Sequence, residues 1–272
     1  MGGFSNFAIS FSIICILAGG IGAFPFALSA GGGASVGIGW LVGAGFAMVV
    51  AAAMAQIASA YPTAGALYHW GSILGGKGWG WATAWFNLLG LIFVTASVNF
   101  GLYDFFFKTL IAPLMGIDVE GLGKMDAVLF VGGVTALQAY LNHKGIKLTS
   151  ALTDMSGYLI FAVAVTLTLS LLIFSPVALD FSRLTTFTNY TGVEGSTWPD
   201  LSGAGMAFLL GLLLTTYTIT GFDASAHTSE ETKNAPVNVP KGILRAVFWS
   251  ALFGYLMVAT FVLTMSSVDD GV

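Results

Sequence analysis

The chain has 272 residues, of which 56% are hydrophobic and only 8% are charged, against about a quarter in an ordinary soluble domain. Its single cysteine, Cys15, excludes a disulfide scaffold and a zinc site built from cysteine pairs. A net charge of −4 with scattered basic residues gives no footprint for nucleic acid. The composition therefore predicts an all-α membrane protein whose surroundings are the lipid bilayer.

Stretches without Asp, Glu, Lys or Arg locate the membrane-spanning helices. A helix needs about 20 apolar residues to cross the hydrocarbon core. The first 76 residues carry none of these charges and hold two crossings, separated by Gly31-Gly32-Gly33. With the later windows, the pattern predicts a single transmembrane domain over 1–272 with seven helices, at about 5–30, 37–59, 78–103, 125–143, 146–174, 203–228 and 240–268.

Basic residues in the short loops predict the orientation, because Lys and Arg are enriched on the cytoplasmic side. With the N-terminus inside, six of them lie in inner loops and three in outer loops. We therefore expect an integral protein of the cell membrane with a cytoplasmic N-terminus. The chain starts almost directly in a helix and stops just after the seventh, so we also expect it to be part of a longer polypeptide.

The first predicted helix contains an irregular segment near its middle, Ala18-Gly19-Gly20-Ile21-Gly22, followed by Pro25. In a helix, each glycine costs about 1 kcal/mol relative to alanine, and proline costs about 3 kcal/mol. Close helix packing could explain the glycines alone. The proline and the mid-span position favour an unwound backbone, which is tolerated in a bilayer only where it is buried in protein or lines a cavity.

The sixth predicted helix has a comparable irregularity. Four threonines, Gly221 and Asp223 follow the purely apolar run 207–214. An ionisable residue inside a span usually marks a pathway or a site. Alternatively, Asp223 lies at the cytoplasmic interface and simply ends the helix. Two interrupted helices are typical of transporters built from inverted repeats, whose half-helix ends bind the charged groups of a substrate such as an amino acid.

Several segments resemble the amino acid–polyamine–organocation superfamily of permeases, and within it the amino acid/choline branch that includes GABA permeases. The resemblance covers essentially the whole chain. The residues that carry it are Ser10–Ile21, Ala55–Trp70, Trp79–Gly90, Gly221–Pro236 and Pro240–Ile243. It implies a fold of twelve helices in five-plus-five inverted repeats, of which this chain holds helices 1–7.

The resemblance also implies a function and a site. The function is secondary active transport, as a symporter or antiporter, of an amino acid or a small amine such as GABA or choline. Asp223 occupies the place of an acidic residue implicated in proton sensing, and Asp154 on the fifth helix is either part of a coupling route or a structural hydrogen-bonding group. The implied substrate-binding residues are Ala18, Gly19, Gly20, Ile21, Gly22, Thr218, Ile219, Thr220, Gly221 and Phe222.

Three departures from the family pattern limit what can be carried over. Gln56 stands where many relatives have Glu, and Ile160 stands where some proton-coupled relatives have a lysine. Gly22 and Ala23 replace hydroxyl residues that follow the glycines in close relatives. The coupling ion, H⁺ or Na⁺, therefore stays open.

Two other classes of function are weaker alternatives. A seven-helix receptor or light-driven pump would need an external N-terminus or, for retinal, a lysine in the middle of the last span, and 246–268 contains none. A membrane enzyme would need a metal or nucleophile motif, and none is present. We therefore expect no catalytic residues, no metal site and no cofactor.

Overall fold

The computed structural model describes residues 1–271, and every regular element in that range is helical, which confirms the all-α prediction. The helix predicted over 125–143 forms as α7 (Lys124–His143). A shorter apolar segment, Ala204–Thr218, lies within the predicted sixth helix. Among the described residues, five helices are long and apolar enough to cross a membrane, and they run over Gly3–Gly22, Phe24–Ala60, Lys77–Leu114, Ile146–Ile173 and Ala235–Thr264.

The chain divides into two compact units. One unit takes Met1–Ala66 and the chain from Thr153 onward, and the other takes Leu67–Leu152. The first unit contains α1 (Gly3–Ile14), α2 (Ile16–Gly22), α3 (Phe24–Ala60), most of α8 (Ile146–Ile173), η2 (Phe181–Leu184), α9 (Ala204–Gly211), α10 (Leu213–Thr218), α11 (Ala224–His227), α12 (Ala235–Thr264) and η3 (Asp269–Gly271).

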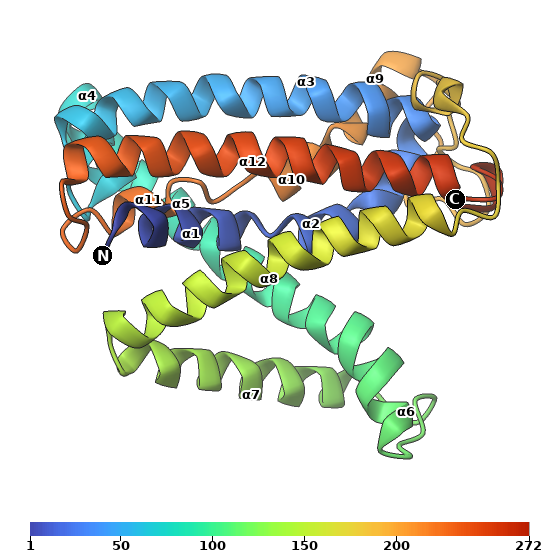
Figure 1. The fold of residues 1–272 in the computed structure, drawn as a ribbon, viewed down its shortest axis with the longest axis horizontal. Coiled ribbons are helices and arrows are strands. Elements are labelled where there is room, and N and C mark those ends of the chain that lie inside the picture. The colour runs from blue at the N-terminus through green and yellow to red at the C-terminus, as the bar shows by residue number, and fades with distance from the viewer. Residues whose placement is uncertain (272) are drawn as a thin grey trace. The chain divides into compact units, whose positions relative to one another are not determined.

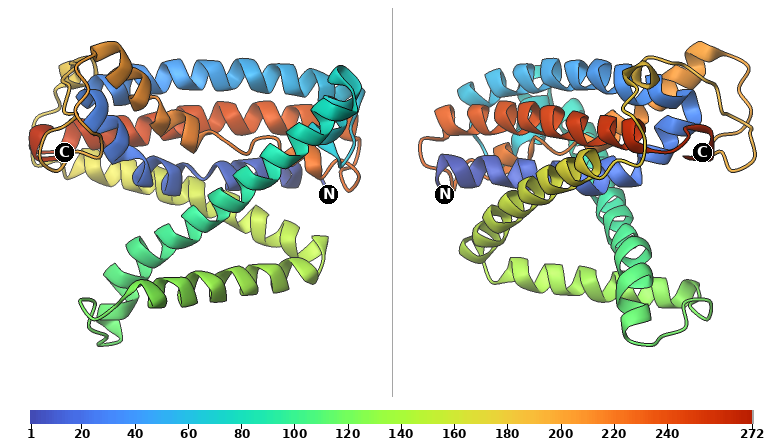
Figure 2. Two further views of the ribbon diagram at one scale, coloured as in Figure 1. Left: turned by 180° about the vertical axis from the view of Figure 1, so that it is seen from behind. Right: turned by 45° about the vertical axis from the view of Figure 1, so that its right-hand side comes forward.

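The core of the first unit lies between α3 and α12, which run side by side along most of their length (Figures 1 and 2). Trp40 on α3 is fully buried, and its indole nitrogen Nε1 donates to the carbonyl oxygen of Ala251 at 2.9 Å. A Cβ at Gly254 would come within 2.5 Å of the Trp40 ring. The glycine therefore lets the two helices approach closely around the tryptophan, as small residues do in membrane helix interfaces.

The predicted break at Gly31-Gly32-Gly33 occurs as a kink inside α3. The backbone leaves helical angles at Gly31 and takes a positive φ of 61° at Gly32, a conformation that favours glycine. The segment after α8 packs into this kink, where Ala34 N–H donates to the carbonyl oxygen of Thr186 at 3.0 Å. Trp198 Nε1 donates to the carbonyl oxygen of Phe26 at 2.7 Å, so this segment is fixed on both sides of the kink.

The second unit contains α4 (Ala66–Gly75), α5 (Lys77–Gly101), the π-helical η1 (Leu102–Ile111), α6 (Ala112–Leu114), α7 and the start of α8. Its best-defined link joins α5 to α7. Asn99 and Gln138 exchange two amide hydrogen bonds of 3.1 and 2.9 Å, and Asn99 also donates to Thr135 Oγ1 at 2.9 Å. Asn99 is buried, so its amide group is not in contact with water. The hydrogen bonds to the neighbouring helix take the place of those to water.

Candidate functional site

The first interruption lies between α1 and α2, at Cys15. This residue has φ 40° and ψ 73°, a left-handed conformation that is uncommon for a residue with a side chain. The segment Ile16–Gly22 is helical, so the prediction that the backbone unwinds at the glycines is wrong in its position: the break comes one turn earlier. α2 ends at Gly22, and Pro25 then sits in the first turn of α3, where its missing N–H costs little.

The second interruption separates α10 from α11 and lies where the sequence predicts it. Helical structure stops at Thr218, Ile219 has φ −93° and ψ 65°, and Gly221 has a φ of 81°. Helical structure resumes at Ala224. The break therefore spans 219–223, and Gly221 supplies the conformation that another residue would adopt only with strain.

The two interrupted regions are in direct contact. A Cβ at Gly19 would lie 2.9 Å from the Cα of Thr218, so α2 and α10 meet backbone to backbone at this point. A Cβ at Gly221 would overlap Ile13 at the end of α1. Only glycine permits these approaches. The glycines of each interrupted region are therefore explained in part by its packing against the other interrupted region.

The ten predicted substrate-binding residues differ in accessibility. Gly19, Gly20, Thr218 and Ile219 are buried, and a Cβ at Gly20 would come within 2.7 Å of Met257 Cε. These four therefore pack the interrupted helices together. Ala18, Ile21 and Thr220 are exposed, Gly22, Gly221 and Phe222 are half-buried, and a Cβ at Gly22 would meet no atom within 4 Å. These six residues are therefore the accessible part of the predicted site.

A buried polar cluster, formed by Asn6, Ser10, Ser225, Thr228 and Thr232, ties α1 to α11 and to the segment after it. Asn6 Nδ2 donates to the carbonyl oxygen of Ser225 at 2.8 Å and lies 3.1 Å from each threonine hydroxyl. Ser10 Oγ donates to the carbonyl oxygen of Phe222 at 2.7 Å and accepts the N–H of Ser225 at 2.9 Å. The polar cluster therefore fixes the distal end of the second break against α1.

Sequence reasoning did not identify this polar cluster. The signal that could have found it is Asn6, an amide within a charge-free apolar helix. Such a side chain needs a partner inside the protein, because hydrocarbon offers none.

Asp223, one of the two predicted coupling residues, lies at the end of the second break. Its carboxylate Oδ2 is 3.2 Å from Nε2 of His227, one helical turn away. The other ring nitrogen of His227 lies 3.3 Å from the carbonyl oxygen of Ala64. Asp223 therefore has a local partner that itself contacts the loop between α3 and α4.

Asp154, the other predicted coupling residue, lies on α8 beside α1. Ser5 Oγ donates to Oδ2 of Asp154 at 2.9 Å, and Oδ1 is buried without a hydrogen-bond partner. A buried polar oxygen without a partner costs free energy. The structure does not bring Asp154 and Asp223 together as a pair, and each approaches a different part of the interrupted helices.

Shifted titrations outside the membrane-spanning segments occur in the segment between α8 and α9. Hydrogen bonds from Ser182 hold the pKa of Asp180 below its ordinary value. Partial burial, together with the neighbouring Asp269 carboxylate, raises the pKa of Tyr190. Among residues 1–271 no group of three or more His, Cys, Asp and Glu side chains is arranged to hold a metal ion.

Comparison with known proteins decides the family. A model of the family described as "Amino acid permease" matches residues 1–271. The chain belongs to this family. It is 37% identical over 267 residues to amino-acid permease BAT1 of Arabidopsis thaliana and 35% identical over 272 residues to its homolog in Oryza sativa. It is also 27% identical over 271 residues to amino-acid permease 2 of Neurospora crassa.

These alignments cover 93%, 94% and 98% of this chain, but 49%, 50% and 48% of the respective relatives, so the chain spans about half the length of the curated relatives it matches. No solved structure matches the chain. Membership in the amino acid permease family confirms the resemblance to the superfamily, and it identifies an integral membrane transporter family and not an enzyme family.

Proposed function

We propose that the full-length protein is a secondary active transporter that carries an amino acid or a related small amine across the membrane by alternating access. One observation carries the proposal beyond family membership. The two interrupted helices touch at Gly19 and Thr218, and beside that contact the backbone around Gly22 and Thr220 is open. Interrupted helices at membrane depth are tolerated where they line a cavity, so we assign the substrate site to the accessible residues beside this contact.

The ends of the short helices supply the chemistry for a zwitterion. The N-terminal turn of α2, which follows Cys15, carries the positive end of the peptide dipoles and suits a carboxylate. The carbonyl groups at the end of α10, around Ile219, carry the negative end of the peptide dipoles and suit an ammonium group. An amino acid satisfies both ends at once, and rocking of the interrupted helices would then expose it to either side.

Proton coupling is assigned within this proposal to Asp154. Its partner Ser5 lies on α1, the helix that leads into the first break. Ala8, also on α1, packs against Gly157 on α8. Protonation of Asp154 therefore changes the contact between α8 and α1. Asp223, by contrast, is partnered by His227 within its own turn. With full-length protein in proteoliposomes, Asp154→Asn is expected to remove the pH dependence of flux, and Asp223→Asn to retain it. The reverse result would reassign coupling to Asp223.

The primary test is uptake of labelled substrates by proteoliposomes containing the full-length protein. The panel includes the common amino acids, GABA and choline, each under a pH gradient and under a sodium gradient. We expect counterflow for at least one amino acid or amine. Counterflow for none of them, with correctly inserted protein, would contradict the proposal. Protease protection of an N-terminal tag in sealed cells tests the cytoplasmic orientation, and surface labelling tests the cell membrane.

The site itself is tested by Gly22→Val. A Cβ at Gly22 meets no neighbouring atom, so the variant is expected to fold while its side chain occupies the accessible part of the predicted site. Transport should fall on the order of tenfold or more, chiefly through a raised KM. Gly45→Val on α3 is the matched control, because a Cβ there also meets no atom within 4 Å. Equal transport by the two variants would remove Gly22 from the site.

A further inference from the structure

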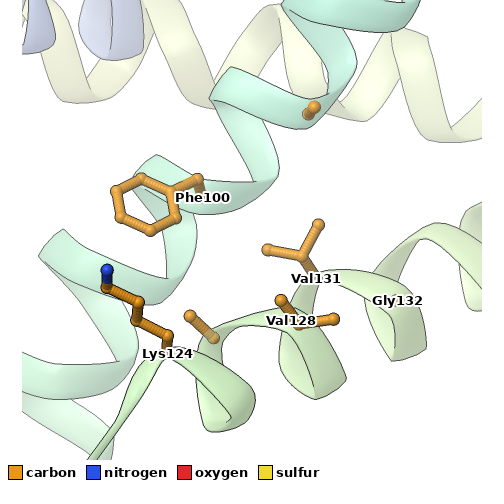
Figure 3. Close-up of a pocket in the computed structure, with 7 residues that line it drawn as sticks. Phe100, Lys124, Val128, Val131 and Gly132 are labelled. Atoms are coloured by element: carbon orange, nitrogen blue, oxygen red, sulfur yellow. The ribbon is translucent and has the colours of Figure 1, made fainter.

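The second unit contains a cavity of about 570 Å³ between α5 and α7 (Figure 3). Apolar side chains make up nearly all of its lining. Phe100 and Ala96 come from α5, and Val128, Val131 and Gly132 come from α7. The one charged lining residue is Lys124, at the first position of α7. The cavity is thus an apolar groove with a single cation at one end.

The same two helices are joined by contacts of residues that do not line the groove. Asn99 and Gln138 exchange amide hydrogen bonds. The rings of Tyr103 and Phe107 have centroids 5.4 and 5.0 Å from that of Phe130. Gly132 contributes no side chain to the lining, and a Cβ there would meet no atom within 4 Å. The groove is therefore a feature of two helices that are otherwise linked.

The charge at the end of the groove lacks a partner. Among the described residues, Lys124 makes no ion pair, whereas Lys108 in the same unit pairs with Asp104 at 2.9 Å. The carboxylate of Asp126 lies in the same turn but accepts the N–H of Gly123 at 2.8 Å. A cation in the first turn of a helix opposes the helix dipole, so a bound anion would be stabilised by the dipole and the lysine together.

We propose that this groove is a binding site for an anionic phospholipid. An acyl chain lies along the apolar lining, and the phosphate of the headgroup contacts the Lys124 ammonium. The argument rests on charge complementarity, because a lysine at the end of an otherwise apolar groove matches a molecule that is anionic at one end and apolar at the other. The sequence places Lys124 in an outer loop, next to the predicted start of a span, which is the depth of a headgroup.

The test uses the full-length protein in nanodiscs that contain a photoactivatable phosphatidylglycerol or its phosphatidylcholine counterpart. Cross-linked peptides are then identified by mass spectrometry. We expect peptides of α5 and α7 around Phe100 and Val128 to be labelled more strongly by phosphatidylglycerol, by about fivefold if one lysine–phosphate contact makes the difference. Equal labelling by the two lipids would overturn the role of Lys124.

Three variants separate the contribution of the Lys124 charge from that of the shape of the groove. Lys124→Gln is expected to lower phosphatidylglycerol labelling to the phosphatidylcholine level, and Gly132→Phe, which fills the groove, to lower labelling by both lipids. Lys144→Gln is the matched control at the opposite end of α7, where the lysine lies 4.7 Å from the Tyr140 ring centroid, and it should change neither. Absence of label on α5 and α7, as when another segment of the full-length protein covers the groove, would overturn the proposal.

Discussion

The two units are built from similarly apolar helices, yet they bury very different shares of them. Half of the apolar window in Gly3–Gly22 is buried within the structure, compared with 6% of the window in Lys77–Leu114. Hydropathy does not distinguish the two, because lipid is as apolar as a protein core. In the first unit, small residues lie at close approaches between distant segments, as at Gly19, Gly33 and Gly254, whereas in the second unit Gly71 and Gly80 lie where the consecutive helices α4 and α5 meet.

This contrast separates two ways of holding membrane helices together. In the first unit, glycines at positions such as Gly19, Gly33 and Gly254 admit a neighbouring backbone or ring, and buried amides and hydroxyls complete the contacts. In the second unit, one amide exchange and one aromatic group join α5 to α7 and leave a groove between them. Substitutions in the first unit should therefore lower the stability of the folded protein more than equivalent substitutions in the second unit.

The largest effect is expected from Gly33→Leu in the kink of α3. A Cβ at Gly33 would overlap the carbonyl oxygen of Arg183, and a backbone atom cannot move aside as the end of a side chain can. Overpacking of this kind costs about 1–3 kcal/mol or more, so we expect a large loss of folded protein and a lower melting temperature. Size-exclusion chromatography after heating measures both. Gly45→Leu is the control, and equal melting of the two variants would contradict the close packing at the kink.

A smaller effect is expected from Asn6→Leu in the polar cluster. The variant removes the shorter of the two hydrogen bonds to the carbonyl oxygen of Ser225, which then keeps only the bond from Thr228 Oγ1 at 3.1 Å. The expected cost is about 1–3 kcal/mol, seen as a lower melting temperature. Because the polar cluster fixes the distal end of the second break, the variant should also change the rate of substrate counterflow. Unchanged stability together with unchanged counterflow would contradict the role of the polar cluster in fixing the second break against α1.

Much of the fold follows from the sequence, for one physical reason. Charges are costly in hydrocarbon, so charge-free windows mark helices such as α5, α8 and α12. The kink at Gly32 and the break at Gly221 are also predictable, because each uses a positive φ that glycine adopts without strain. These features depend on local preference, and the sequence carries local preference directly.

The remainder depends on contacts between distant segments. Cys15 has no intrinsic preference for the left-handed conformation that it adopts, and the glycines after it stay helical, so local preference does not give the position of the first break. The pairing of Asn6 with Ser225 joins residues 219 positions apart. Neither partner can be chosen from composition or periodicity. The roles of the ten substrate-binding residues and of Asp154 and Asp223 stay predictions until flux is measured.

The smallest effect is expected from Asn99→Leu in the second unit, and it sharpens the comparison with Asn6→Leu. Asn99 is also buried and makes three hydrogen bonds, but all of them go to the side chains of Thr135 and Gln138 on one neighbouring helix. Side-chain hydrogen bonds between membrane helices contribute about 0.6 kcal/mol on average. In the variant, Gln138 is free to turn toward other partners, whereas the Ser225 carbonyl that Asn6 serves is fixed in the backbone and keeps only the Thr228 hydroxyl. Melting curves of the two variants, measured in the same lipid, should place Asn99→Leu closer to the unsubstituted protein. If Asn99→Leu instead lowers the melting temperature more than Asn6→Leu, the amide exchange would contribute more to stability than the polar cluster does.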